Sequence, residues 1–137
     1  SKDTITGFTE GSGSTADVLD VSADITATSL TTNSMTANTT VADGAIYVVD
    51  VNAAITAKAY DAGDFADLFA GSGVAFNTTT TDEEFLIVAQ GTDETQIILV
   101  DTSADGTAAD ITAADVEIIG VLSDVINTDT FAIGNFA

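Results

Sequence analysis

The chain has 137 residues and an extremely one-sided charge, because 22 Asp and Glu residues stand against 2 lysines, with no Arg and no His. Proteins that bind nucleic acids or anionic lipid surfaces need Lys and Arg to neutralise phosphate groups. The formal net charge of -20 therefore excludes both classes of partner and predicts a chain that attracts cations. The absence of Cys also excludes disulfides, thiolate metal sites and thiol nucleophiles.

A high net charge usually accompanies disorder, but 45% of these residues are hydrophobic. That proportion supplies enough apolar surface to offset the conformational entropy lost on folding. We therefore expect a folded chain and, at this length, one domain comprising residues 1–137. No run of 18 apolar residues is present, so we expect no membrane insertion.

Apolar and polar residues alternate with period two far more often than with period 3.6, and Thr, Val, Ile and Ala dominate the alternating segments. This pattern is typical of strands, so the sequence predicts a mainly β fold. The expected strands, in chain order, are residues 4–8, 18–21, 45–51, 84–90, 96–101, 116–121 and 130–133. Three runs are apolar on both faces, as interior strands are: residues 46–49, 85–88 and 97–100.

The connections between these strands differ in character. Residues 26–40 are rich in Thr, Ser, Asn and Ala, and two interpretations stay open, a long surface loop or an edge strand. An edge strand would present unpaired main-chain groups to which another strand can pair. Residues 91–94, with the sequence Gly-Thr-Asp-Glu, form a short polar connector and predict a β-hairpin.

One segment, residues 57–70, breaks the β pattern. Phe65, Leu68 and Phe69 recur at helical spacing, and two aspartates lie where negative charge favours the first turn of a helix. A glycine follows immediately and offers a stop. We expect one short amphipathic helix at about residues 57–70.

The sequence shows no catalytic constellation. General acid–base catalysis most often uses His, which is missing, and only Lys2 and Lys58 remain to stabilise an anion or activate a nucleophile. Pairs of carboxylates arise by chance among 22 acidic residues, and glycosidase sites normally add aromatic platforms that a chain with 2 Tyr and no Trp barely supplies. We therefore predict that the chain is not an enzyme and has no catalytic residues.

Calcium binding is the chemistry that this composition favours, because Ca²⁺ prefers six to eight oxygen ligands supplied by flexible acidic loops. The leading candidate loop is residues 101–110. Asp101, Ser103 and Asp105 precede Gly106 as in the first half of an EF-hand loop, where alternate side chains converge on the ion.

The second half of this loop departs from the EF-hand pattern, because its twelfth position is Thr112 and not a bidentate Glu. Asp110 or Asp115 would then close a looser calcium site. An Asp- and Gly-rich segment also makes a good turn without any ion, so both interpretations remain open. Asp17 and Asp20 are a second candidate for cation binding, although acids at a spacing of three also simply decorate a surface.

Three phrases of the sequence occur in a fixed order. The first is Asp-Thr-Ile-Thr-Gly-Phe at residues 3–8 with Asp-Val-Leu-Asp-Val-Ser at 17–22, and the second is the hairpin strand and Asp/Gly turn at 99–106. The third is Glu-Ile-Ile-Gly-Val at 117–121 with Asn-Thr-Asp-Thr-Phe-Ala-Ile at 127–133. Together they resemble the C-terminal domains of RTX-like proteins, which bacteria export by type I secretion.

The resemblance covers about half of the chain. The glycine- and aspartate-rich nonapeptide repeats that normally precede such domains are absent, and residues 23–91 match no phrase of the family. The resemblance implies a β-sandwich or β-roll-like domain that is exported unfolded and folds on meeting external calcium. It thus implies a secreted protein, in the medium or on the bacterial cell surface, with calcium as its cofactor.

Two functions fit this sequence. The first is a non-enzymatic structural protein of the cell surface, a surface-layer, filament or adhesin-type subunit. It would form a homo-oligomer or polymer through β-strand addition. The alternative is the C-terminal secretion and calcium-binding module of a larger secreted hydrolase. A soluble domain of a halophile, whose acidic residues serve salt tolerance, is a third interpretation of the charge.

Overall fold

The computed structural model describes residues 3–12, 14–22, 25–32, 39–50, 76–78, 83–91, 94–103, 111, 113–123 and 131–137. The strands in these ranges are β1 (Asp3–Ile5), β2 (Ser29–Thr32), β3 (Thr39–Thr40), β4 (Ala45–Asp50), β5 (Phe76–Asn77), β6 (Glu84–Gln90), β7 (Thr95–Asp101) and β8 (Val116–Leu122). Two short 3₁₀ helices accompany them, η1 (Ala113–Asp115) and η2 (Ile133–Asn135). The mainly β class expected from the sequence is confirmed.

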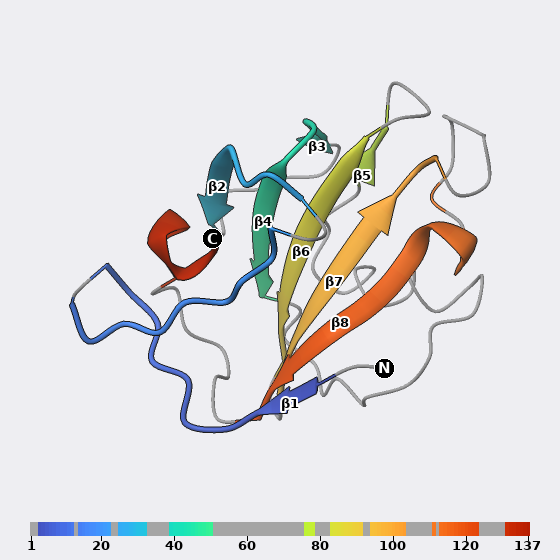
Figure 1. The fold of residues 1–137 in the computed structure, drawn as a ribbon. Coiled ribbons are helices and arrows are strands. Elements are labelled where there is room, and N and C mark those ends of the chain that lie inside the picture. Colours follow the sequence, from blue (N-terminus) through green and yellow to red (C-terminus); the bar gives the residue numbers. More distant parts are fainter. Residues whose placement is uncertain are drawn as a thin grey trace.

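Six strands form one mixed sheet in the order β1-β8-β7-β6-β4-β2 (Figure 1). The central pairs, β6 with β7 and β7 with β8, are antiparallel. The outer strands are added in parallel, with β4 on β6, β2 on β4 and β1 on β8. The predicted hairpin is confirmed between β6 and β7, where the Gly91 N–H donates to the Glu94 carbonyl at 2.9 Å.

Both faces of the sheet are buried, as predicted for β4, β6 and β7. Alternate residues point to opposite sides of each strand, so each face collects its own apolar cluster. The first, which we call the Tyr47 face, contains Val41, Ala45, Tyr47, Val49, Phe85, Ile87, Ala89, Ile98 and Val100. The second, the Phe131 face, contains Phe8, Val21, Ile25, Ile46, Val48, Leu86, Val88, Ile97, Leu122, Phe131 and Phe136.

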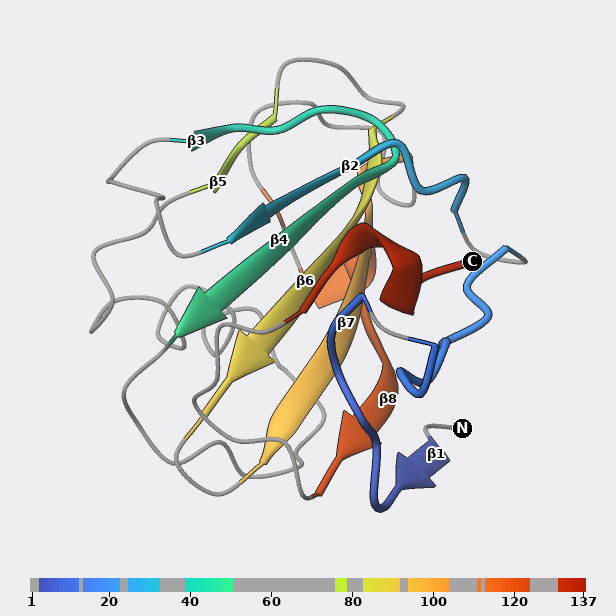
Figure 2. The same cartoon turned by 90° about the vertical axis from the view of Figure 1, so that its left-hand side faces the viewer.

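Different parts of the chain cover the two faces. The terminal segments cover the Phe131 face, where the Phe131 ring centroid lies 6.0 Å from that of Phe8 and 5.9 Å from that of Phe136. On the Tyr47 face, β5 of the two-stranded β3–β5 ribbon brings the Phe76 ring to within 5.6 Å of the Tyr47 ring. Figure 2 shows the C-terminal segment and the β3–β5 ribbon on opposite sides of the sheet. Burial on both faces leaves the edges of the sheet as its accessible main chain.

Main-chain hydrogen bonds tie the two ends of the chain together. The Leu19 N–H donates to the Asn135 carbonyl at 2.7 Å, and the Ala137 N–H donates to the Leu19 carbonyl at 2.9 Å. The Val21 N–H donates to the Ala137 carbonyl at 2.6 Å. Residues 18–21, predicted as a strand, therefore make only one isolated bridge of β type, between Leu19 and Phe136.

The strand predicted at residues 130–133 is wrong in its described part. The Asn135 N–H donates to the Ala132 carbonyl at 2.9 Å and the Phe136 N–H donates to the Ile133 carbonyl at 3.1 Å, which closes the 3₁₀ helix η2. Phe131 and Phe136 are both buried on the same side of the sheet, so the chain between them turns. The first predicted strand, residues 4–8, is also too long, because β1 ends at Ile5.

The open question about residues 26–40 is answered for its described part. Residues 29–32 form β2, the outermost strand of the sheet beside β4, and residues 39–40 form β3. The edge-strand interpretation is therefore confirmed for β2. The helix predicted at residues 57–70 lies outside the described residues.

Candidate functional site

The first predicted calcium ligands lie at the end of β7. The Asp101 carboxylate accepts hydrogen bonds from the Ser103 N–H at 2.8 Å and from the Ser103 hydroxyl at 2.6 Å. This is the local turn that an Asp side chain makes with the residue two positions later. Asp105 and Asp110, the other predicted ligands in this loop, lie outside the described residues. The structure thus brings Asp101 and Ser103 together, and both bonds fall on the same oxygen, Oδ1.

The start of this loop is anchored by Thr102, which is fully buried. The Thr102 N–H donates to the Glu83 carbonyl at 3.1 Å, and the Thr102 hydroxyl oxygen accepts from the Glu83 N–H at 3.0 Å. These bonds hold the chain after β7 against the chain before β6. Any ion that binds in the loop would therefore have one fixed side, formed by Asp101 and Ser103.

The carboxylates of the second predicted pair, Asp17 and Asp20, accept hydrogen bonds from different residues. The Asp17 carboxylate accepts from the Thr9 N–H at 2.8 Å, whereas the Asp20 carboxylate accepts from the N–H and hydroxyl of Ser22 at 3.1 and 2.6 Å. The Ser22 hydroxyl, followed by the Ser22 N–H, lowers the pKa of Asp20 because both donors favour the ionised carboxylate. Asp20 thus accepts within its own turn, whereas Asp17 closes a longer loop that begins at Thr9.

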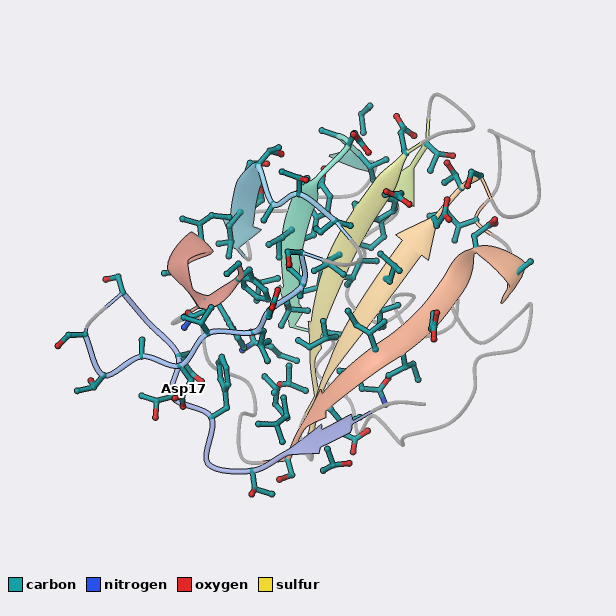
Figure 3. The ribbon with its side chains drawn as sticks, in the orientation of Figure 1. Asp17 is labelled. Carbon is teal, nitrogen blue, oxygen red and sulfur yellow. The ribbon has the colours of Figure 1, made fainter. Side chains whose placement is uncertain are left out.

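The acidic turns lie in different parts of the molecule. Figure 3 shows Asp17 on the N-terminal segment, well away from the end of β7 that carries Asp101. Within the described ranges, no group of three or more Asp or Glu side chains is placed to hold a metal ion. Asp101 and Ser103 are thus the described members of the predicted calcium loop, and the other predicted ligands of that loop lie outside the described residues.

A groove of about 260 Å³ runs between the N-terminal segment and the sheet. It is lined mainly by apolar side chains, and Asp20 is its only ionisable lining residue. Its lining residues are Ile5, Val18, Leu19, Asp20, Val21, Ile97, Ile119 and Gly120. No pair of a nucleophile and a base lines this groove, so its chemistry is that of an apolar surface.

The edges of the six-stranded sheet are the remaining candidate site. In the described part of the chain, no strand pairs with the outer side of β2. On the opposite edge, β1 pairs only with residues 120–122 of β8, so residues 116–119 of β8 have no described partner strand on that side. Free main-chain donors and acceptors along a sheet edge are a template for pairing with another chain.

The two edges differ in their protection. Natural edge strands usually carry Lys, other charged side chains, Pro or a bulge that discourages pairing. β2 has the sequence Ser-Leu-Thr-Thr, and no charged residue occurs anywhere between residues 25 and 42. The β8 edge carries one charge, on Glu117, and an irregularity where Ile119 is inserted in the pairing with β7. Sequence reasoning suggested the first edge but missed the second, because β8 has the alternating pattern of any strand.

No family model matches the chain, and no curated protein or solved structure matches it. The resemblance to RTX-like domains therefore stays an expectation from the sequence. Among the residues whose structure is described, no helix is long and apolar enough to cross a membrane.

Proposed function

We propose that this protein is a non-enzymatic structural subunit that associates with itself outside the cell, as surface-layer, filament and adhesin-type subunits do, and that calcium stabilises it. The observation that carries the proposal is that, among the described residues, no strand pairs with the outer side of β2. Strand addition to such an edge joins subunits through main-chain hydrogen bonds.

The rest of the described surface favours this mode of association over contact between apolar patches. Both faces of the sheet are already covered, by the terminal segments and by the β3–β5 ribbon with its neighbours. The exposed large apolar side chains in the described ranges are Val18 and Ile133, exposed to 55% and 44%. Strand addition needs little apolar surface, because main-chain hydrogen bonds supply much of the affinity.

The negative charge of the subunits opposes their association, so cations should be needed. Two copies that each carry a formal charge of -20 repel each other, and bound or screening cations reduce this repulsion. The β2 edge is a place where the repulsion is least, because it lies in the uncharged stretch from residue 25 to residue 42. Calcium would act both by neutralising the acidic surface and by completing the turn that begins at Asp101 and Ser103.

The test is the molar mass of the purified chain, measured by light scattering over a range of protein concentrations. We expect the mass to rise with concentration in millimolar CaCl₂ and to fall again when a chelator is added. NaCl at matched ionic strength is the control that separates ion binding from screening. A monomer at every concentration and in every buffer would contradict the proposal and would favour the alternative, a secretion and calcium-binding module of a larger protein.

A further inference from the structure

We infer that the groove beside Asp20 binds a small free molecule that carries one ammonium group on a short aliphatic chain. The groove lies between the N-terminal segment and the sheet, and its lining residues all belong to the described part of the protein. The alkyl chain would lie along the apolar wall, and the ammonium group would meet the Asp20 carboxylate. This inference is independent of the proposed self-association.

The walls of the groove supply the apolar part of the site. Three isoleucines, Ile5, Ile97 and Ile119, come from β1, β7 and β8, and Val18 and Leu19 come from the N-terminal segment. The Val18 side chain is 55% exposed, so part of this apolar surface is in contact with water. An alkyl chain laid along the groove would remove apolar surface of both partners from water, which favours binding in proportion to the area covered.

Gly120 leaves room in the groove because it has no side chain. It pairs with Ile97, so a side chain at position 120 would lie on the same face of the sheet as Ile97. A Cβ at this position would be 3.7 Å from Cγ1 of Ile97, which is an ordinary van der Waals contact. The groove therefore contains a space that one methyl group would fill without strain.

The Asp20 carboxylate supplies the polar part of the site. Its Oδ1 accepts hydrogen bonds from the Ser22 N–H at 3.1 Å and from the Ser22 hydroxyl at 2.6 Å, which hold the carboxylate in its turn. Among the described residues, no donor bonds to Oδ2. One oxygen is thus held by the protein, and the other is available for a charge-assisted hydrogen bond from an ammonium group.

The charge of the protein selects the head group of the ligand. Asp20 is the only ionisable residue that lines the groove, and the chain has a formal net charge of -20. A carboxylate or phosphate on the ligand would be repelled by Asp20 and by the whole acidic surface, whereas an ammonium group is attracted by both. One carboxylate in the groove matches one ammonium group.

The size of the groove limits the ligand to a small molecule. Its volume of about 260 Å³ lies below the range of about 300–1,000 Å³ that is typical of pockets for drug-sized ligands. A short unbranched alkyl chain suits this volume. A peptide that presents a lysine would also need partners for its main-chain groups, and the apolar side chains of the lining offer none.

Titration with hexylammonium chloride, followed by proton–nitrogen NMR spectra of the purified protein in calcium-free buffer, tests the site. We expect saturable shift changes centred on residues 18–21 and 119–120. Binding should tighten by about threefold for each methylene between butylammonium and hexylammonium, because each methylene covers more apolar surface. Hexanol and hexanoate keep the alkyl chain without the positive charge and should bind at least about threefold more weakly than hexylammonium.

Three variants separate the groove from the rest of the acidic surface. Asp20→Asn removes the charge but keeps an oxygen that can accept from Ser22, and it should weaken hexylammonium binding by about threefold to fivefold. Glu117→Gln removes one charge from an exposed position of β8 outside the groove lining and should leave the affinity nearly unchanged. Gly120→Ala narrows the groove and should abolish the gain from butylammonium to hexylammonium. Thermal unfolding checks that all three variants retain the fold.

Three results would overturn the inference. Equal affinities of the Asp20→Asn and Glu117→Gln variants, or shift changes spread over the whole surface, would mean that ammonium ions bind the acidic surface in general. Hexanol binding as tight as that of hexylammonium would mean that Asp20 plays no part. Tighter binding of a lysine with blocked main-chain groups than of butylammonium, which has the same chain length, would point to a peptide ligand. Light scattering measures self-association separately, so the proposed function stands or falls independently of these results.

Discussion

Asn135 shows at the scale of one residue how the chain ends are held on the sheet. Its side chain is fully buried and accepts hydrogen bonds from the N–H groups of Gly11 and Ala132, at 2.9 and 3.0 Å. Its amide group donates to the Asp17 carbonyl at 2.7 Å. One side chain therefore forms hydrogen bonds with three main-chain groups that lie outside the strands of the sheet.

We expect Asn135→Ala to reduce the free energy of unfolding by about 2–3 kcal/mol, because it removes three hydrogen bonds and leaves partly buried main-chain groups without their partner. Urea unfolding followed by circular dichroism measures the change. Ile133→Ala, in the same 3₁₀ helix but 44% exposed, is the control and should cost less than about 1 kcal/mol. Equal losses for the two variants would contradict the role assigned to Asn135.

The Tyr47 hydroxyl should make the stability of the fold vary with pH in the alkaline range. Burial raises the pKa of the Tyr47 hydroxyl above its ordinary value of 10.0, against a smaller lowering by the Ala42 N–H, and the Glu83 carboxylate raises it further. Near pH 10 the unfolded chain releases this proton while the folded chain keeps it. The folded state then binds more protons, so its stability is complete below that pH and is lost as the pH rises through the folded pKa.

The measurement is urea unfolding of the unmodified chain and of Tyr47→Phe between about pH 8 and pH 11. We expect the unmodified chain to lose stability more steeply above pH 10 than the Phe variant. At neutral pH the Phe variant should be slightly less stable, because the Ala42 N–H loses its acceptor at 3.0 Å. Parallel pH curves would show that Tyr47 does not carry this dependence.

At the scale of elements, β2 is positioned by a contact with Gly44. The Thr28 N–H donates to the Gly44 carbonyl at 2.8 Å, immediately before β2 begins. Gly44 has a φ of +70°, and a Cβ there would collide with the Thr26 carbonyl oxygen and crowd the Thr28 side chain. The open edge therefore depends on a position that only glycine occupies without strain.

Gly44→Ala should lower the free energy of unfolding by about 1–3 kcal/mol and should displace β2 from β4. We also expect weaker self-association of this variant, since the edge strand would no longer be held in line. Gly134→Ala is the matched control, because no atom lies within 4 Å of the Cβ that it would add. Urea unfolding and light scattering report the two effects. A Gly44→Ala protein with unchanged unfolding would contradict the assigned contact.

At the scale of the whole molecule, the proposed calcium binding predicts that stability depends on this cation. An ion that binds only the folded state stabilises it by about 2.7 kcal/mol when its concentration exceeds the dissociation constant a hundredfold. We expect millimolar Ca²⁺ to raise the melting temperature relative to chelator at fixed ionic strength. Asp105→Ala should reduce this shift, whereas Asp93→Ala, in the β6–β7 hairpin, should not. An unchanged melting temperature would remove calcium from the proposed function.

Local pattern in the sequence was sufficient to predict the centre of the sheet. Residues 84–90 form β6 with the predicted boundaries, and β4, β7 and β8 differ from their predicted ranges by one residue at an end. Long alternating or fully apolar runs predict such strands because burial of one or both faces dominates their energetics. The hairpin followed in the same way from a short polar connector between two such runs.

The sequence by itself thus determined the β class, the interior strands, the extreme charge and the candidate edge at residues 26–40. Only the tertiary structure decided that the outer strands add in parallel, that residues 131–136 turn to bury two Phe rings, and that β1 pairs with residues 120–122 of β8. These features depend on contacts between residues far apart in the chain, such as Leu19 with Phe136, and no local period records them. The order and direction of the strands at the sheet edges, on which the proposed self-association depends, follow from those long-range contacts.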